Sequence, residues 1–165
     1  MTAFRHTRSN EVIVRTAPDF LQRAFEKLRR LLQPARDAGY DTSRVYLILD
    51  EVLSNVYKHG YKRVDGQPIG VQLEVRGERC VITSRDLAPT FDSARHARTR
   101  VLPDPESGSP GGRGLVIVNR MCESFEHYAP PEGGNMLRMV MKLIPSREVV
   151  EMKPVRARKT EESRS

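Results

Sequence analysis

Glu51, Asn55 and His59 stand four residues apart in the segment LDEVLSNVYKHGY, residues 49–61. A helix turns about 100° per residue, so positions four apart lie about 40° apart and form one ridge. This ridge flanks an apolar stripe, which predicts half-buried polar groups that need partners. The amide oxygen of Asn55 suits Mg²⁺, and Glu51 suits a general base for a hydroxyl or water. An ordinary solvated helix face gives the same spacing, so other segments must decide.

A second group lies in SPGGRGLVIV, residues 109–118, where Gly111, Gly112 and Gly114 precede a predicted helix. Glycines let a backbone approach a ligand closely, and a helix N-terminus offers N–H groups and positive potential to phosphate. Arg113 could add a charge-assisted contact to phosphate. The segment is neither a P-loop nor a dinucleotide fingerprint, because no Gly-Lys-Ser/Thr follows and no strand leads directly into it. An ordinary flexible loop before a helix is the alternative.

The third candidate is Asp86, which ends a predicted strand where a long loop begins. A carboxylate there can accept a hydrogen bond from an exocyclic amine such as that of adenine, or it can serve as a turn residue. The four histidines show no metal-ligand spacing, so no zinc site is predicted. Cys80 and Cys122 lie in apolar stretches, which is typical of buried thiols in a reducing cytosol.

Two helices are predicted in the first part of the chain, after a short strand at residues 11–16. The first begins near Pro18 and Asp19, and Pro34 should end or kink it. The second begins near residues 41–43 and ends at Gly60. Apolar side chains at helical spacing mark the two buried faces: Leu21, Phe25, Leu28 and Leu32 in the first, and Val45, Leu49, Val52 and Val56 in the second.

Strands dominate the second part of the chain. Alternation predicts strands at 71–75 and 80–84, joined by a tight turn at Gly77-Glu78, and two more at 124–128 and 136–144. Between these pairs, residues 87–112 show little periodicity, and a loop of about 20 residues inside a domain is often a functional lid. A helix follows from Gly114. The order favours an α/β two-layer sandwich, with a mixed sheet covered on one face by helices.

The composition fits one soluble domain, predicted at residues 8–145, with a flexible charged tail at 146–165. The net charge of +7 favours an acidic partner or nucleotide phosphates. A nucleic-acid binder is a rival reading, but aromatic residues make up only 6% and no helix-turn-helix signal is present, so no direct nucleic-acid contact is predicted. The N-terminus does not resemble a signal peptide and no apolar run suits a membrane span, which predicts a cytoplasmic protein.

Three stretches together resemble a known family. DEVLSNVYKHGY, then SRD followed by PTFD, then GGRGLVIVNRMCESFEH are similar to the bacterial anti-sigma factor serine kinases, which belong to the Bergerat-fold (GHKL) ATP-binding superfamily. The resemblance covers roughly residues 8 to 144 in order. It implies the Bergerat ATP-binding fold, with residues 87–112 as the ATP lid.

The resemblance also implies roles. Glu51 would activate the substrate hydroxyl, Asn55 would hold Mg²⁺ against the ATP phosphates, and Asp86 would read the adenine amine. The glycine box would supply the remaining ATP-binding residues: Gly111, Gly112, Arg113, Gly114 and Leu115. Members of the family phosphorylate a serine of a STAS-domain anti-anti-sigma protein and sequester a sigma factor, and many are homodimers.

The sequence departs from the family at two positions. Ala88 stands where the family often has the glycine of Asp-x-Gly, and Asn135 follows Gly134 where the family often has Gly-Thr. Both changes touch adenine and phosphate binding. They favour the alternative of a catalytically weak or inactive Bergerat-fold module that regulates a partner by nucleotide-dependent or nucleotide-independent association.

Overall fold

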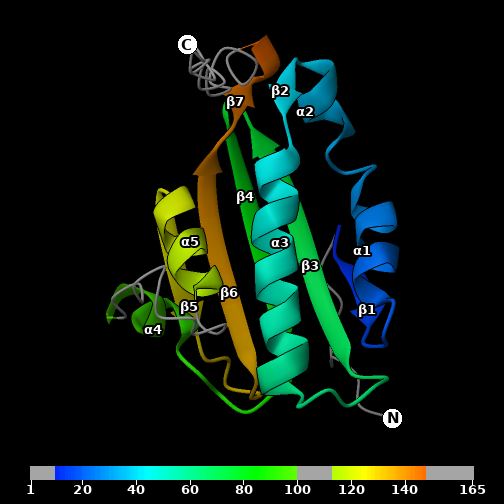
Figure 1. Cartoon of the computed structure of the whole chain (residues 1–165), viewed down its shortest axis with the longest axis vertical. Coiled ribbons are helices and arrows are strands. Elements are labelled where there is room, and N and C mark those ends of the chain that lie inside the picture. The colour runs from blue at the N-terminus through cyan, green and yellow to red at the C-terminus, as the bar shows by residue number, and fades with distance from the viewer. Residues whose placement is uncertain (1–9, 100–112, 148–165) are drawn as a thin grey trace, which may run out of the picture.

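The computed structural model describes residues 10–99 and 113–147 (Figure 1). The elements in chain order are β1 (Val12–Arg15), α1 (Phe20–Leu28), α2 (Gln33–Asp37), β2 (Tyr40–Asp41), α3 (Ser43–Asn55), a π-helical turn (Val56–Gly60), β3 (Pro68–Arg76), β4 (Arg79–Asp86), α4 (Ser93–Thr99), α5 (Gly114–Met121), β5 (Ser124–Tyr128), β6 (Asn135–Lys142) and β7 (Ile144–Pro145). The four longer predicted strands and the helix predicted from Gly114 are confirmed.

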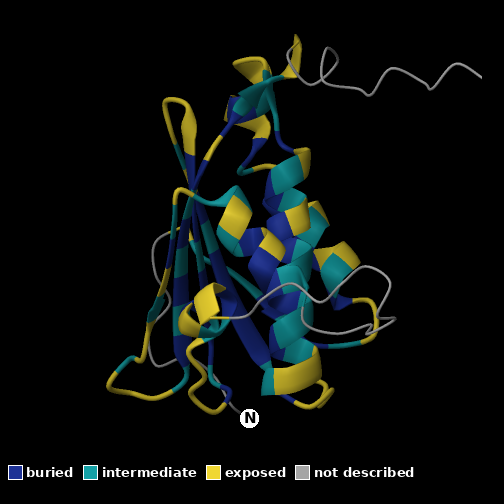
Figure 2. Ribbon diagram, turned by 60° about the vertical axis from the view of Figure 1, so that its left-hand side comes forward, coloured by how far each residue is buried: buried dark blue, intermediate teal, exposed yellow. Residues whose placement is uncertain are grey.

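The main sheet has the order β1-β3-β4-β6-β5, and helices cover one of its faces (Figures 1 and 2). The two-layer α/β architecture is therefore confirmed. The prediction of a mixed sheet is wrong for the described strands, because every neighbouring pair is antiparallel. Short turns join β3 to β4 and β5 to β6, and a short turn can link only antiparallel neighbours.

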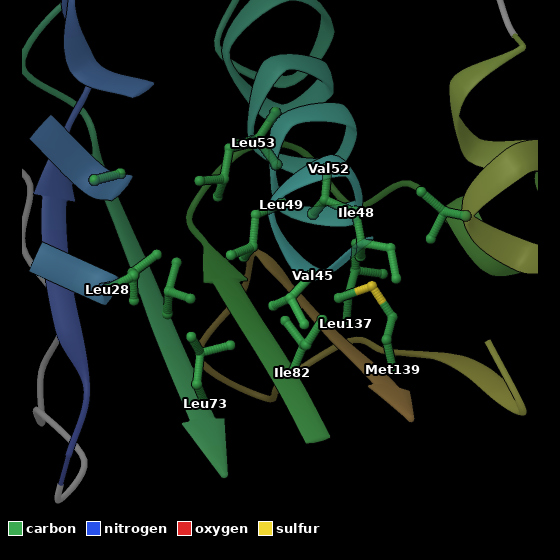
Figure 3. Close-up of a cluster of buried hydrophobic side chains, with 14 of the residues drawn as sticks. Leu28, Val45, Ile48, Leu49, Val52, Leu53, Leu73, Ile82, Leu137 and Met139 are labelled. Carbon is green, nitrogen blue, oxygen red and sulfur yellow. The ribbon is translucent and has the colours of Figure 1, made fainter. Parts of the chain in front are cut away.

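Helix α3 lies along the covered face and supplies the centre of the core (Figure 3). Its predicted apolar stripe is confirmed, since Val45, Leu49, Val52 and Val56 are all buried. Before its first turn, Asp41 accepts a hydrogen bond from the backbone N–H of Ser43 at 3.1 Å. The side chains of α3 pack on Leu73, Ile82, Leu137 and Met139 from three neighbouring strands. This packing fixes the position of the polar ridge beside the stripe.

Two predictions about helices are wrong, one about where a helix ends and one about an irregular loop. Helix α1 ends at Leu28, and Pro34 instead lies in the first turn of α2, where the missing N–H of proline costs no helical hydrogen bond. Helix α4 lies inside the segment predicted as an irregular lid, and the carboxylate of Asp92 accepts the backbone N–H of Arg95 at its start. The buried side chains of α4 are alanines, so it has no strong apolar pattern. The rest of the predicted lid, residues 100–112, lies outside the described residues.

A second, two-stranded sheet pairs β2 with β7, and the backbone N–H of Ser146 donates to the carbonyl of Gly39. The start of the predicted tail is thus attached to the domain. Residues 148–165 and the N-terminal boundary at residue 8 lie outside the described residues, so the domain limits stay a prediction. Within 10–99 and 113–147, no helix has the length and apolar character needed to cross a membrane.

Candidate active site

The polar ridge of α3 is shorter than its sequence spacing suggests. Glu51 and Asn55 are half-buried beside the core stripe, whereas His59 is exposed. The reason is the π-helical turn at Val56–Gly60, which adds a residue to the last turn and rotates His59 away from the line. The backbone N–H of Tyr61 closes this turn on the carbonyl of Val56 at 2.8 Å. Such wide turns are frequent at functional sites.

The amide of Asn55 is oriented by its own helix. Its Nδ2 donates to the backbone carbonyl of Glu51 at 2.7 Å, so Oδ1 points away from that carbonyl. No hydrogen bond to Oδ1 is found from residues 10–99 or 113–147. The residue is half-buried, and an amide oxygen held in this way is a suitable hard ligand for Mg²⁺. The donor set at this position therefore fits the implied cation.

The carboxylate of Glu51 lies directly against the start of α5. A Cβ placed on Gly114, the first residue of α5, would be 1.8 Å from Oε2 of Glu51 and 2.7 Å from its Cδ. Only a residue without a side chain can stand there while Glu51 keeps its place. Two candidates 63 positions apart in sequence are thus brought together by the packing of α3 beside α5.

The other residues of the glycine box divide into two sets. Arg113 is half-buried and occupies the N-cap position of α5, and Leu115 is buried in the core. Leu115 can therefore contact a ligand only through its backbone N–H, which is one of the unpaired donors of a helix first turn. Gly111 and Gly112 lie outside the described residues.

Asp86 ends β4 and is 3% exposed. Its Oδ1 accepts two hydrogen bonds of 2.9 Å, one from the backbone N–H of Ala88 and one from Nδ2 of Asn135. Burial raises the pKa of the Asp86 carboxyl, while these two hydrogen bonds act in the opposite direction. Within the part of the chain that the structure describes, Oδ2 accepts no hydrogen bond, so this oxygen is the one suited to an amine.

Tyr61 supports the chain that follows Asp86, and its spacing in the sequence gave no sign of this. Its hydroxyl donates to the carbonyl of Pro68 and accepts from the backbone N–H of Leu87, each at 2.7 Å. Burial raises the pKa of Tyr61 to about 12. The residue thereby connects the end of the π-helical turn to the strand end that carries Asp86.

The departure at Ala88 is accommodated by Gly60, the last residue of the π-helical turn. The Ala88 side chain is 3% exposed, and a Cβ placed on Gly60 would lie 2.9 Å from its methyl group. Ala88 does not have a positive φ, so this position does not need the conformational freedom of glycine. The methyl group therefore packs toward the helix instead of straining the loop.

The two groups of candidates lie on the same face of the sheet. Strand register places Asp86 and Ser84 on the face that carries Ile82 and Cys80, which is the face covered by α3. The hydroxyl of Ser84 is buried and has no hydrogen-bond partner within the described residues. A polar group in that state is costly to keep beside a core. No hydrogen bond or ion pair joins Asp86 to Glu51 or Asn55 in the described part, so any joint role depends on a shared ligand.

A shallow apolar hollow of about 470 Å³ lies elsewhere, between α1 and α3. Its lining residues are Gln22, Phe25, Glu26, Arg29 and Tyr46. None of the candidate residues contributes to it. It lacks the glycine-lined helix start and the acid–amide pair found beside α5, so it is a poor match for a nucleotide.

Comparison with known proteins decides the family. Residues 14–141, from within β1 to within β6, match the family described as histidine kinase-like ATPase domain. The chain belongs to this family. A curated relative, the anti-sigma F factor of Oceanobacillus iheyensis, is 22% identical over 148 residues, covering 89% of this chain and 94% of that protein. The resemblance in the motifs is thus confirmed at the level of the ATPase domain, with a distant relationship to an anti-sigma factor.

Family membership implies that this ATPase domain binds ATP. Every described candidate lies within the matched segment: Glu51, Asn55, Asp86, Arg113, Gly114 and Leu115. The comparisons do not assign a role to any single residue, so these roles stay predictions. Their chemistry fits the implied nucleotide, since they combine a carboxylate that can accept a hydrogen bond from an amine with a helix N-terminus suited to phosphate.

Proposed function

We propose that the chain is a protein-serine kinase of the anti-sigma factor type, which transfers phosphate from Mg²⁺-ATP to a STAS-domain partner. The observation that carries this proposal is the contact of the Glu51 carboxylate with Gly114 at the start of α5. It puts a potential base beside the N–H groups of a helix start, where phosphate is favoured. Asn55 lies one helical turn further along α3, with its Nδ2 held by the backbone carbonyl of Glu51, and its amide oxygen would serve as the Mg²⁺ ligand.

In the proposed reaction, the serine oxygen of the partner forms a bond to the γ-phosphorus as the bond to the β,γ-bridging oxygen breaks. ADP leaves, and Glu51 accepts the proton of the serine hydroxyl. Asn55 would hold Mg²⁺, whose charge neutralises the phosphates when it is bound. The N-terminus of α5 would orient the phosphate groups, and Asp86 would select adenine by accepting a hydrogen bond from its amine.

The proposed partners are those that the resemblance of the sequence motifs implies, and the distant relationship to an anti-sigma F factor supports them. They are a STAS-domain anti-anti-sigma protein as substrate and a sigma factor as the sequestered protein, with a homodimer as the proposed assembly. The net charge of +7 is compatible with acidic surfaces on such partners. A cytoplasmic location, an 8–145 domain and a flexible tail remain part of the same proposal.

The test is incubation of the full chain with γ-labelled ATP, Mg²⁺ and a panel of purified STAS-domain proteins. We expect label on a serine of one partner. In Glu51→Gln the rate of phosphoryl transfer should fall by about 10²-fold or more, while ATP binding remains measurable. If ATP only changes the association with a partner and no label is transferred, the chain is the non-catalytic regulatory module instead. That outcome would contradict the kinase proposal.

A further inference from the structure

Asn135 is a buried residue at the start of β6, and its amide nitrogen faces three acceptors. Nδ2 lies 2.9 Å from Oδ1 of Asp86 and 3.3 Å from each of the backbone carbonyls of Ala88 and Pro89. Asn135 is only 6% exposed. An amide oxygen in this position would face three other oxygens, so the surroundings fix the orientation of the amide.

The amide oxygen of Asn135 faces donors on the other side. Oδ1 accepts from the backbone N–H of Phe91 at 2.8 Å and lies 3.0 Å from Nε2 of His127. Since an amide oxygen can only accept, Nε2 must carry the hydrogen, which fixes that tautomer of His127. The other ring nitrogen, Nδ1, is 3.9 Å from Asp92, too far for a hydrogen bond.

The amide of Asn135 therefore has its donors and its oxygen engaged by protein groups. It has little capacity left for a ligand, unlike a hydroxyl at the same position. Its contacts instead join the end of β4, which carries Asp86, to the segment 88–91 that leads toward α4. Gly134 makes this approach possible, because a Cβ there would lie 2.1 Å from the backbone carbonyl of Asp86.

We propose that Asn135 is a positioning residue for base recognition, which holds one oxygen of Asp86 so that the other remains for the adenine amine. The same amide fixes Phe91, so the first segment after β4 is held at the point where the base is read. This inference rests on the proposed ATP site. It explains the departure at Asn135 as a different way of supporting Asp86, in which a protein amide takes the place of a ligand-facing hydroxyl.

Two substitutions separate the two halves of this role. In Asn135→Asp, a second carboxylate replaces the donor 2.9 Å from Asp86, so the acid loses its support and gains a like charge. In Asn135→Thr, the single hydroxyl can still donate to Asp86. That one oxygen cannot stand both where Nδ2 meets Asp86 and where Oδ1 meets Phe91, so the contact with Phe91 is lost.

The experiment compares the affinity of the full chain for ATP and for purine riboside triphosphate, which lacks the exocyclic amine. Circular dichroism and thermal melting confirm that each variant folds. We expect the wild type to prefer ATP by about tenfold or more, as for a hydrogen bond to a charged group. Asn135→Asp should lose this preference. Asn135→Thr should lose less of it, while the Phe91 amide exchanges its hydrogen at least about tenfold faster.

An unchanged preference in a folded Asn135→Asp variant would overturn the inference, as would full protection of the Phe91 amide in Asn135→Thr. Asp86→Ala is the control that tells this failure from a failure of the ATP site. If Asp86→Ala abolishes the preference and Asn135→Asp does not, only the role of Asn135 is wrong. If the wild type binds neither nucleotide, the ATP site and this inference fall together.

Discussion

Replacing Gly114 with alanine is expected to separate activity from stability. The new Cβ would lie 1.8 Å from Oε2 of Glu51, so the carboxylate must retreat by roughly 1.5 Å to reach an ordinary contact of 3.4 Å. The clashing atoms belong to the end of a flexible side chain, which can turn away at small cost. Alanine also suits the first turn of a helix better than glycine, by up to about 1 kcal/mol.

We therefore expect the stability of Gly114→Ala to change by less than about 1 kcal/mol, while kcat for phosphoryl transfer falls by about 10²-fold. A misplacement of about 1 Å is enough for a loss of that size, and the contribution of a general base is typically 10²–10⁴. The assay measures kcat with labelled ATP and a phosphorylatable STAS partner, and the free energy of unfolding by urea titration.

Gly70 offers a matched control on the opposite face of the sheet. A Cβ there would lie 2.2 Å from Oε1 of Glu11, whose carboxylate forms a bidentate ion pair with Arg85. The two charged side chains are only 2% and 8% exposed, so disturbing this pair should cost about 2–3 kcal/mol. Gly70→Ala should thus lose stability and keep its kcat per folded molecule.

The reasoning about Gly114 is refuted if Gly114→Ala keeps the kcat of the wild type. A double-mutant comparison sharpens the test. In a Glu51→Ala background there is no carboxylate to displace, so adding Gly114→Ala should change the residual rate by less than about twofold. A large further loss in that background would mean that Gly114 acts through the phosphate-facing backbone and not through Glu51.

Three further predictions concern the binding groups. Asn55→Ala should abolish the dependence of ATP affinity on Mg²⁺, as measured by ATP titration with and without the metal. If the wild type and Asn55→Ala depend equally on Mg²⁺, Asn55 is not a metal ligand. Burial raises the Asp86 pKa above its ordinary 3.8, so the ionised acid destabilises the fold at any pH above the raised pKa, and this cost disappears as the pH falls through it. Asp86→Asn should therefore be more stable than the wild type at pH 7. Urea titrations at successively lower pH should show this difference in unfolding free energy shrinking. Tyr61→Phe should lose about 1–3 kcal/mol of unfolding free energy and expose the Leu87 amide to exchange, whereas an unchanged amide would show that Tyr61 does not support this segment.

Sequence patterns predicted the parts of the fold that repeat. The stripe on α3 and the alternation in β3, β4 and β6 follow from periods of 3.6 and 2, so their buried faces could be predicted. The ridge of Glu51 and Asn55 could be predicted for the same reason, because it lies beside that stripe. The π-helical turn could not, since nothing in VYKHG signals an added residue, and His59 was therefore assigned to the wrong line.

The contacts that support the site depend on tertiary approach. The place of Glu51 against Gly114 results from packing between two helices far apart in the chain, and no local spacing encodes it. The roles of Tyr61 and Asn135 depend on hydrogen bonds to residues 26 and 49 positions away. The one available signal was that Asn135 follows a glycine pair at a strand start and departs from the related family. Helix α4 was missed because its buried residues are alanines.

The central claim is that Glu51, Asn55, Gly114 and Asp86 surround one nucleotide. A crystal structure of the full chain with Mg²⁺ and a non-hydrolysable ATP analogue tests it most directly. We predict that Oδ1 of Asn55 coordinates the metal, that the phosphates meet the N-terminus of α5, and that the free oxygen of Asp86 accepts the adenine amine. An analogue bound away from α3, or a metal held without Asn55, would contradict the account.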